Sequence, residues 1–267
     1  MGKDLLANPD EMITLFRGKR AGLFFDIDGT LLPLQAQPAD AVISPRLRTA
    51  VHRLSRTTHV VLLSGRSVAE SRRIVGLDGV TYSGNHGAEW HSDGVEWVIL
   101  EAQPYIATIH QIAADAVIRL GYVEGIYIED KGPSLSIHYR QAEDRVAAGV
   151  AIDAFVRDHP AAQGLKRTVG KLVVDLRPPI DVNKGTSVEL MVTDLDLEVA
   201  VVFGDDVTDV DSFLTIRRLR NEGQVAGAAV GVLSPGTPDV VCDAVDFMLA
   251  DTDAVEEFVV WLAEELS

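Results

Sequence analysis

The chain has 267 residues, a formal net charge of −16 and 47% hydrophobic residues. So acidic a composition argues against nucleic acid or an anionic membrane as the main partner, because phosphates are bound by stripes of Lys and Arg. The hydrophobic fraction indicates a globular chain with a sizeable core. Cys242 is the one cysteine, which rules out an intrachain disulfide and points to a reducing compartment. Since neither a signal peptide nor an apolar run of roughly 20 residues is evident, we expect a cytoplasmic protein.

Several short, almost continuously apolar segments have the pattern of strands buried on both faces. They occupy residues 21–26, 60–63, 80–83, 199–203, 228–233 and 246–249. Amphipathic helices are predicted between them. One begins at the N-cap pair Ser44-Pro45, and another begins after Ser67, with Glu70 at capping-box spacing and Gly76 to end it. This alternation predicts an α/β fold, a Rossmann-like parallel sheet flanked by helices.

The middle of the chain has a different pattern. Its predicted elements are helices at 104–120 and 143–157 and strands at 127–131, 134–140 and 171–177. Apolar and polar residues alternate in these strands, as in a sheet with one buried and one solvated face. The sequence therefore predicts an inserted α+β cap domain at residues 105–178, with residues 1–104 and 179–267 forming the core domain.

Two carboxylates follow the first predicted strand, in the run Asp26-Ile-Asp28-Gly29-Thr30. In open parallel sheets, ligands bind beyond the carboxyl ends of the strands. Carboxylates two residues apart there can face one substrate and share one cation, and one can attack phosphorus while the other moves protons. An ordinary Asp-Gly turn is the structural alternative, whereas an EF-hand is excluded because its Asp-x-Asp-x-Asp-Gly frame is absent.

Four more carboxylates crowd the end of the strand at 199–203, namely Asp205, Asp206, Asp209 and Asp211. Their mutual repulsion is unfavourable without a cation, and a set of oxygen ligands suits Mg²⁺. A solvated helix N-terminus, where acids are favoured, is the alternative. The presence of a second acidic strand end favours the metal site.

Two further positions extend this edge of the sheet. Ser64-Gly65-Arg66 follows the second strand and offers a hydroxyl and backbone N–H groups to an anion, although a simple N-cap turn explains it equally well. Lys184 begins the helix after the insert, where it could neutralise a nucleophilic carboxylate and a phosphoryl group. Taken alone, a lysine at this position is more often an ordinary surface residue.

Four motifs of this chain, in order, resemble those of the haloacid dehalogenase superfamily of phosphotransferases. They are Asp-x-Asp-Gly-Thr, Ser, Lys and Gly-Asp-Asp. Asp28 stands where its P-type ATPase branch has threonine, and a second carboxylate suits a phosphatase. From about residue 20 to the end, further motifs resemble the trehalose-6-phosphate phosphatase family. They are Gly84-Asn85-His86-Gly87-Ala88-Glu89, Glu129-x-Lys131, Ser134-x-x-x-His138-Tyr139-Arg140, Gly170-Lys171-x-Val-Val-Asp175-x-Arg177-Pro178, Asn183-Lys184-Gly185 and Gly204-Asp-Asp-x-Thr-Asp209. The chain departs from that family at Asp175 and Val210, where the family usually has Glu.

The resemblance implies a Mg²⁺-dependent phosphatase that hydrolyses trehalose 6-phosphate through an aspartyl-phosphate. Asp26 is then the nucleophile and Asp28 the acid and base, with Ser64 and Lys184 completing the catalytic set. The implied metal ligands are the Asp26 side chain, the Asp28 main-chain carbonyl and Asp205, while Asp206 and Asp209 orient waters and Lys184. The implied substrate-binding residues are Gly65, Arg66, Asn85, His86 and Gly87 in the core, and Glu129, Lys131, Ser136, His138, Arg140, Asp175 and Arg177 in the cap.

Strand alternation supports the cap residues independently of the resemblance. It places Glu129 with Lys131 on one face, and likewise Ser136 with His138. Such a polar sheet face can hydrogen-bond sugar hydroxyls, and an ordinary solvated sheet face is the alternative.

Three other functions remain open from the sequence. One is the same chemistry on another sugar phosphate, such as a glucosylglycerol or mannosylglycerate phosphate. A receiver-type switch that is phosphorylated on an acidic cluster is a second, although it needs neither Asp28 nor a cap. A catalytically silent regulatory subunit is disfavoured because every catalytic position is filled. The expected partner is a small phosphosugar, with no nucleic acid and no membrane, and the expected state is a monomer.

Overall fold

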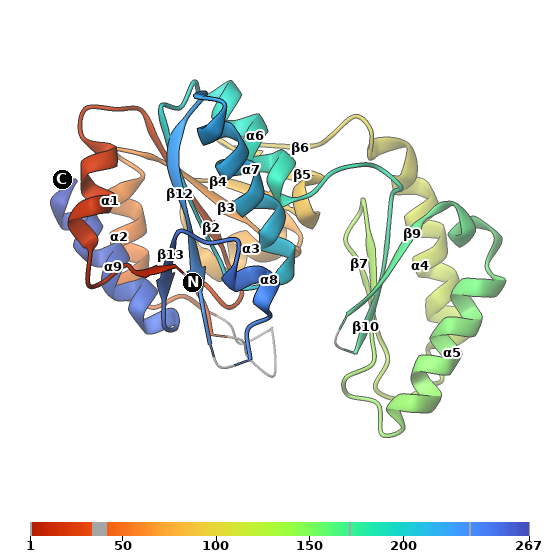
Figure 1. Cartoon of the computed structure of the whole chain (residues 1–267). Helices are drawn as coiled ribbons and strands as arrows, with labels where there is room; N and C mark the ends of the chain where they lie inside the picture. Colours follow the sequence, from red (N-terminus) through yellow and green to blue (C-terminus); the bar gives the residue numbers. More distant parts are fainter. Residues whose placement is uncertain (1, 34–41, 171, 235, 267) are drawn as a thin grey trace. The chain divides into compact units, whose positions relative to one another are not determined.

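The computed structural model describes residues 2–33, 42–170, 172–234 and 236–266. The chain folds into two compact units, which are drawn in Figure 1. The first comprises Met1–Trp97 and Val182–Ser267, and the second comprises Val98–Asp181. The domain junctions expected after residues 104 and 178 both lie within the second unit.

A large sheet forms the centre of the first unit. Its strands are β1 (Lys3–Asp4), β2 (Ala21–Asp26), β3 (His59–Leu63), β4 (Thr81–Gly84), β5 (Glu89–Ser92), β6 (Val95–Val98), β11 (Val199–Gly204), β12 (Ala226–Val232) and β13 (Phe247–Leu249). Among the described residues they form one nine-stranded sheet in the order β1-β13-β12-β11-β2-β3-β4-β5-β6. Every pairing from β1 to β4 is parallel, whereas β5 pairs antiparallel with β4. The predicted parallel α/β sheet is confirmed.

Helices cover both faces of this sheet (Figure 1). They are α1 (Pro9–Phe16), α2 (Pro45–Leu54), α3 (Val68–Val75), α6 (Lys184–Asp194), α7 (Val210–Asn221), α8 (Asp239–Cys242) and α9 (Thr252–Glu265). The apolar faces of α1, α2, α3 and α9 share one hydrophobic core with the strands. The predicted helix starts are present, since Ser44 Oγ accepts from Leu47 N at 3.0 Å and Ser67 Oγ accepts from Glu70 N at 3.2 Å.

The register of the central strands brings the predicted catalytic residues to one edge. Strands β2 and β11 are buried along their whole length and pair directly, with Phe25 opposite Phe203. On the other side of β2, Asp26 lies opposite Leu63 of β3. The residues that follow these three strands therefore meet at the carboxyl edge, where parallel sheets bind ligands.

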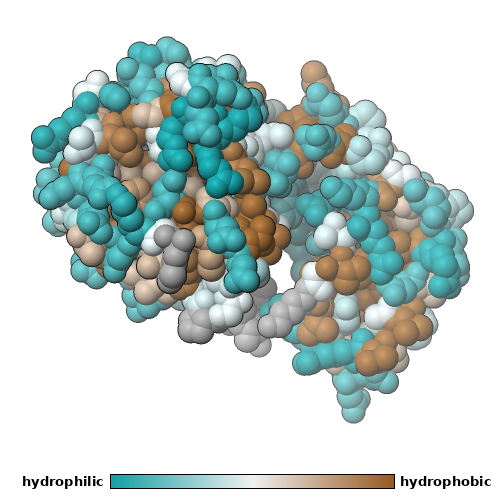
Figure 2. All heavy atoms as spheres, viewed as in Figure 1, coloured by the Kyte–Doolittle hydropathy of each residue, from teal (hydrophilic) through white to brown (hydrophobic). Residues whose placement is uncertain are grey.

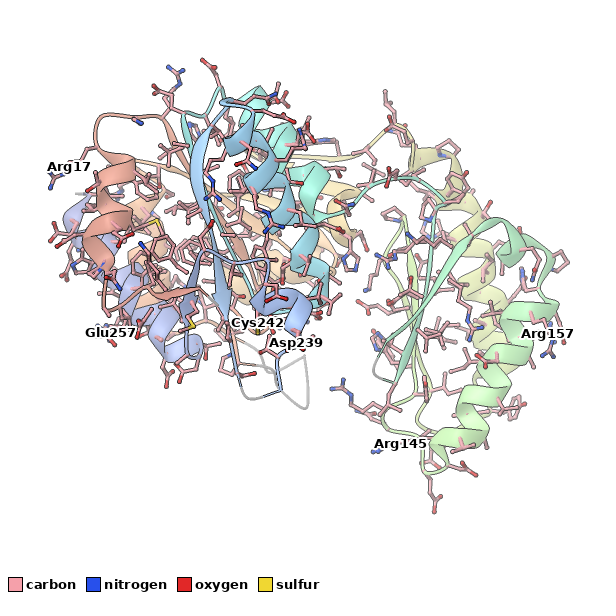
Figure 3. All side chains as sticks on the ribbon, viewed as in Figure 1. Arg17, Arg145, Arg157, Asp239, Cys242 and Glu257 are labelled. Carbon is pink, nitrogen blue, oxygen red and sulfur yellow. The ribbon has the colours of Figure 1, made fainter. Side chains whose placement is uncertain are left out.

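The second unit pairs a small sheet with two helices. Its strands are β7 (Tyr127–Asp130), β8 (Leu135–His138), β9 (Lys166–Gly170) and β10 (Val173–Arg177), and its helices are α4 (Ile106–Leu120) and α5 (Arg145–Asp158). Over the described residues the sheet is antiparallel in the order β7-β8-β10-β9. Leu135, Ile137, Val174 and Leu176 pack into a core with the helices, and Arg145 and Arg157 mark the two ends of α5 (Figure 3). Lys171, expected at the start of the last strand, lies outside the described residues.

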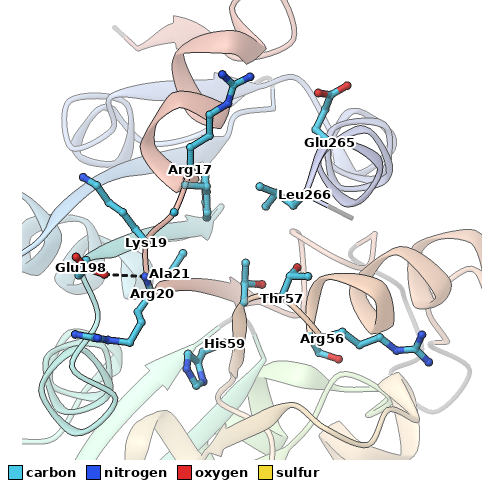
Figure 4. A pocket seen from close by; sticks show the side chains of 14 residues that line it. Arg17, Lys19, Arg20, Ala21, Arg56, Thr57, His59, Glu198, Glu265 and Leu266 are labelled. Carbon is cyan, nitrogen blue, oxygen red and sulfur yellow. Dashed lines mark hydrogen bonds between the residues drawn. The ribbon is translucent and has the colours of Figure 1, made fainter.

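A pocket of about 740 Å³ lies at the opposite edge of the large sheet, beside the amino ends of β2 and β3. It contains charges of both signs, and Arg20 N donates to Glu198 Oε2 at 3.0 Å there (Figure 4). Its place at the amino edge separates it from the predicted catalytic residues.

Hydrophilic side chains predominate on the visible face of the molecule, with hydrophobic ones among them (Figure 2). Within the described residues, none of the helices combines the length and apolar character needed to cross a bilayer.

Candidate active site

A buried lysine joins two carboxylates at the carboxyl edge of the large sheet. Lys184 Nζ donates to Asp26 Oδ1 and to Asp209 Oδ1, both at 2.6 Å. The side chains of Lys184, Asp26 and Asp209 are 4%, 7% and 1% exposed. Burial lowers the pKa of Lys184, but Asp209 and Asp26 outweigh that effect and raise it, so the ammonium stays charged. The lysine predicted to neutralise a carboxylate is therefore in contact with it.

The negative charges around Asp26 exceed the positive charge that Lys184 supplies. Burial raises the pKa of Asp26 well above its ordinary value, and Lys184 works against that rise. Asp209 and Asp205 raise it further by repulsion. An ionised Asp26 therefore needs a further positive charge nearby.

Asp205 is the unsatisfied member of the acidic group. Its Oδ1 is buried and has no hydrogen-bond partner among the described residues. Burial and the neighbouring Asp209 and Asp206 raise the pKa of Asp205 to about 7. A buried carboxylate oxygen without a donor is costly. This oxygen is available as a ligand for a cation.

The two acidic strand ends approach each other closely because residue 29 is glycine. A Cβ atom on Gly29 would lie 2.1 Å from Asp205 Oδ2, and the residue has φ +90°. Any other residue would be strained and would collide with the carboxylate. Gly29 thus allows the loop after β2 to meet the loop after β11.

Asp209 and Asp206 have partners of their own. Asp209 Oδ2 accepts from the backbone N–H groups of Asp205 and Asp206, both at 3.1 Å, while its Oδ1 accepts from Lys184. The carboxylate of Asp206 is exposed and accepts from Thr208 N at 3.3 Å. Although Asp26, Asp205 and Asp209 offer oxygens within 4.8 Å of one another, both oxygens of Asp209 are already engaged. Asp26 and Asp205 are therefore the members of this group whose side chains could hold a hard cation.

Arg66 connects the loop after β3 to Asp28. Its Nε and Nη2 donate to the two carboxylate oxygens of Asp28 at 2.6 and 2.7 Å. Its Nη1 donates to Glu70 Oε1 at 2.5 Å. The guanidinium is thus bound by two carboxylates, and they raise the pKa of Arg66 although burial opposes the rise.

Ser64 and the loop after β4 support the same edge. Ser64 Oγ accepts from Arg66 N at 3.1 Å, and the Ser64 carbonyl accepts from His86 N at 2.9 Å. Asn85 and His86 have φ values of +51° and +56°, a left-handed conformation that non-glycine residues seldom adopt. A Cβ on Gly65 would lie 2.7 Å from the His86 ring, so these two loops touch. Strain of this kind concentrates at functional sites.

Glu89 holds that strained loop in place. Its Oε2 accepts from Asn85 Nδ2 at 2.8 Å and from Val68 N, at the start of α3, at 3.0 Å. Gly87 completes the run of positive φ values at +106°. The predicted residues Ser64, Gly65, Arg66, Asn85, His86 and Gly87 therefore lie in contacting loops.

The polar face of the second unit forms a separate cluster. Paired positions on neighbouring strands form the row Glu129, Ser136, Asp175 and Thr168. Ser136 Oγ donates to Asp175 Oδ1 at 2.5 Å, and Arg177 Nη2 donates to Thr168 Oγ1 at 3.0 Å. The opposite face carries the apolar residues that pack on the helices. The predicted division into a polar and an apolar face is therefore present.

Glu129 lies close to two other predicted residues of this face. His138 Nε2 lies 2.8 Å from Glu129 Oε2, and Lys131 Nζ lies 3.8 Å from the same oxygen. Arg140 lies beyond the end of β8 and is exposed. Its main-chain carbonyl accepts from Arg145 Nε at 3.2 Å.

Two residues of these clusters were missed by the sequence analysis. Thr168 lies on β9, whose residues Lys166–Gly170 lack the alternation that revealed its neighbours. Glu70 was assigned to helix capping from its spacing. The Ser67 side chain does cap α3, but the Glu70 carboxylate binds Arg66.

The parallel core with its inserted α+β unit is the fold of solved phosphatases of the haloacid dehalogenase class. The C-terminal domain of Candida albicans trehalose-6-phosphate phosphatase superposes with a TM-score of 0.75, over 99% of this chain and 98% of that one, at 23% identity. A trehalose-6-phosphate phosphatase related protein superposes with a TM-score of 0.73, over 91% and 97% of the two chains, at 21% identity.

The family model for trehalose-phosphatase matches residues 24–233, and the chain belongs to that family of phosphoric monoester hydrolases. It is 30% identical to a probable trehalose-phosphate phosphatase of Oryza sativa over 97% of this chain and 70% of the rice protein. It is 36% identical to the trehalose-phosphate phosphatase of Mycobacterium marinum over 73% of this chain and 51% of that protein. The chain thus matches only about half of the mycobacterial relatives' length.

Proposed function

We propose that this chain is a Mg²⁺-dependent phosphatase that hydrolyses trehalose 6-phosphate to trehalose and phosphate. One observation carries the proposal: Asp26 contacts Lys184 where the loop of Asp28 and Gly29 meets Asp205, at the adjoining ends of β2 and β11. Family membership and the names of the relatives in rice and mycobacteria support this substrate.

In the first proposed step, an oxygen of Asp26 attacks phosphorus. The oxygen–phosphorus bond forms as the bond from phosphorus to the sugar oxygen breaks. Asp28, protonated at the start of this step, donates its proton to that leaving oxygen, which departs as the hydroxyl of trehalose. Lys184 stays within 2.6 Å of Asp26 and balances negative charge on the aspartyl-phosphate.

In the second proposed step, water removes the phosphoryl group from Asp26. Asp28, now ionised, accepts a proton from the water as its oxygen attacks phosphorus. The bond from phosphorus to Asp26 breaks and phosphate leaves, which restores the Asp26 carboxylate and the protonated Asp28. The hydroxyl of Ser64 and the neighbouring backbone N–H groups suit the phosphoryl oxygens.

The proposed Mg²⁺ ligands are the side chains of Asp26 and Asp205 and the main-chain carbonyl of Asp28. The unpartnered oxygen of Asp205 supports this choice. Asp209 keeps Lys184 in place, and the exposed Asp206 is available to orient water. A bound Mg²⁺ would supply positive charge that favours attack on the phosphoryl group.

We propose that the second unit is a cap that recognises the sugar. The row Glu129, Ser136, Asp175 and Thr168 presents charged and hydroxyl groups side by side, with His138, Lys131 and Arg177 beside it. Sugar hydroxyls both donate and accept, so they complement such a mixed surface. Arg140 is proposed as a further contact at the end of β8.

The proposed setting is the cytoplasm, since the one cysteine, Cys242, is free and suits a reducing compartment. The proposed partner is the phosphosugar alone, and the proposed state is a monomer.

A phosphate-release assay tests the proposal. Trehalose 6-phosphate, glucosylglycerol phosphate, mannosylglycerate phosphate and glucose 6-phosphate are compared at equal concentration with Mg²⁺ present. We expect the highest kcat/KM on trehalose 6-phosphate and no release by an Asp26→Asn variant. A higher kcat/KM on one of the other phosphates would replace the substrate, and release by the variant would remove the mechanism.

A further inference from the structure

We propose that Arg66 and Glu70 act as a positioning pair for Asp28, with Glu70 fixing the guanidinium that in turn fixes the Asp28 carboxylate. The inference rests on the proposed function, in which Asp28 is the acid and base. It assigns a role to Glu70, which lies outside the catalytic motifs, and gives Arg66 a task other than substrate binding.

Each nitrogen of the Arg66 guanidinium contacts a defined carboxylate oxygen. Its Nε and Nη2 hold both oxygens of Asp28 at 2.6 and 2.7 Å, and its third nitrogen, Nη1, holds Glu70 at 2.5 Å. A planar guanidinium that binds both oxygens of a carboxylate fixes its rotation as well as its position. The side chains of Arg66, Asp28 and Glu70 are 13%, 31% and 25% exposed. Asp28 is therefore oriented from its protein side while part of it remains accessible.

The backbone of Arg66 is held as firmly as its side chain. Its N–H donates to Ser64 Oγ at 3.1 Å, and its carbonyl accepts from Asn85 N at 2.8 Å. These backbone hydrogen bonds do not restrain the long side chain between the backbone and the guanidinium. Glu70, on the first turn of α3, restrains that end of it.

Helix capping does not account for the Glu70 carboxylate. The cap of α3 uses the backbone N–H of Glu70, which donates to Ser67 Oγ at 3.2 Å. A change from Glu70 to Gln keeps that N–H and the side-chain shape. It removes the charge that binds Arg66 and that also lies 3.9 Å from Nη2 of the exposed Arg73. The variant therefore tests positioning and leaves the helix start intact.

The leaving group distinguishes positioning of the acid from general support of the fold. A sugar alkoxide leaves poorly unless it is protonated, whereas p-nitrophenolate leaves readily without a proton. Loss of an oriented Asp28 should thus slow phosphoryl transfer from trehalose 6-phosphate and spare transfer from p-nitrophenyl phosphate. A merely structural role would slow both.

The experiment measures transfer in single turnovers, with enzyme in excess and Mg²⁺ present, by rapid quench for trehalose and stopped flow for p-nitrophenolate. For Glu70→Gln we expect transfer from trehalose 6-phosphate to fall about 10-fold, part of the roughly 100- to 10,000-fold that a positioned acid contributes, and p-nitrophenolate release to change less than about twofold. The matched control is Glu96→Gln, which breaks the pair of Glu96 with Arg72 of α3, 2.8 Å apart. It should change neither rate.

A double variant shows whether Glu70 acts through Asp28. Asp28→Asn alone should slow trehalose 6-phosphate selectively, and adding Glu70→Gln should cause no further loss. Equal loss on both substrates in Glu70→Gln, an additive loss in the double variant, or an unchanged or faster transfer from trehalose 6-phosphate in Glu70→Gln would each overturn the positioning pair. If Asp28→Asn itself shows no selectivity, the acid–base assignment of the proposed function is wrong instead.

Discussion

The innermost ion pairs of the two polar clusters of this chain differ in how deeply they are buried. At the carboxyl edge of the large sheet, the side chains of Lys184 and Asp209 are 4% and 1% exposed. On the polar face of the second unit, Lys131 and Glu129 are 12% and 20% exposed. Charges that water cannot screen interact strongly with a reacting group, whereas accessible ones can exchange water for a ligand. The difference suits the first cluster to chemistry and the second to recognition.

The energetic cost of the clusters differs in the same way. Burying Lys184 between Asp26 and Asp209 loses hydration that their mutual attraction has to offset, so it is weak evidence for a stabilising role. The more exposed pair of Glu129 with His138 costs less to form and contributes little to stability. Removing one partner of the buried cluster should therefore cost stability as well as activity, because it leaves a buried charge uncompensated, whereas breaking the more exposed pair should be felt mainly in activity.

Asp26→Asn should produce the largest effect and should not distinguish between substrates. An amide is a poor nucleophile, so we expect kcat to fall at least about 1,000-fold on both trehalose 6-phosphate and p-nitrophenyl phosphate. The measurement is steady-state turnover, with the exposed Asp194→Asn as a control that keeps wild-type rates. Substantial turnover of either substrate by Asp26→Asn would show that another group attacks phosphorus.

Removal of the metal should also abolish activity on both substrates. After exhaustive chelation, we expect no turnover until Mg²⁺ is added back. Asp205→Asn should weaken Mg²⁺ binding by more than about 10-fold, because outer-sphere residues alone contribute about that much. Asp211→Asn, which changes an exposed carboxylate at the start of α7, should bind Mg²⁺ as the wild type does.

Calorimetric titration measures this Mg²⁺ binding independently of turnover. Full activity in a sample that elemental analysis shows to be metal-free would contradict the site. Equal weakening by Asp205→Asn and Asp211→Asn would move the metal away from Asp205.

The difference in burial between the two clusters also explains which features the sequence could predict. The strand at 21–26 was predicted to the residue, because a buried strand must be apolar and its end is marked by Asp26. The meeting of Asp26 with Lys184 followed from the rule that parallel strands bind ligands at their carboxyl edge. Burial and topology constrain such features strongly, so they leave a clear local pattern.

Features that leave no distinctive local pattern were missed. The carboxylate of Glu70 turns toward Arg66 and not toward the cap of α3, and spacing alone cannot distinguish these contacts. β9 is a short strand with mostly exposed side chains, so its sequence lacks a buried face. The adjacent strands β5 and β6 had a usable signal, since Asp93-Gly94 between them is a typical hairpin turn with positive φ at both residues.

A change on the polar face of the second unit should separate the two substrates. For Glu129→Gln we expect kcat/KM on trehalose 6-phosphate to fall about 10- to 100-fold, the value of a hydrogen bond to a charged group. On p-nitrophenyl phosphate the change should stay within about twofold, because remote contacts position only the larger substrate.

Asp130→Asn is the matched control for Glu129→Gln. Asp130 is the next residue on β7, so strand alternation points it to the other face, where it contacts His110 at 2.5 Å. It should leave both substrates unaffected. Equal losses on both substrates for Glu129→Gln would mean that this face supports the catalytic unit and does not select the sugar.

Changes at Asp175 should have the smallest effect on activity and give the most specific test of that face. It lies at the centre of the polar row, paired with Ser136 on one side and Thr168 on the other, and Ser136 Oγ donates to it at 2.5 Å. Asp175→Ala removes the carboxylate and leaves that hydroxyl without its acceptor, so kcat/KM on trehalose 6-phosphate should fall about 10-fold.

Asp175→Glu keeps the charge, adds one methylene and restores the residue usual in the family. If the sugar hydrogen-bonds the carboxylate directly or through a water, kcat/KM of this variant on trehalose 6-phosphate should stay within about threefold of the wild-type value. Both variants should keep their rate on p-nitrophenyl phosphate, which is the internal control for folding. A loss in Asp175→Glu as large as in Asp175→Ala would show that the shorter side chain is required, and that the contact with Ser136 matters more than the charge offered to the sugar.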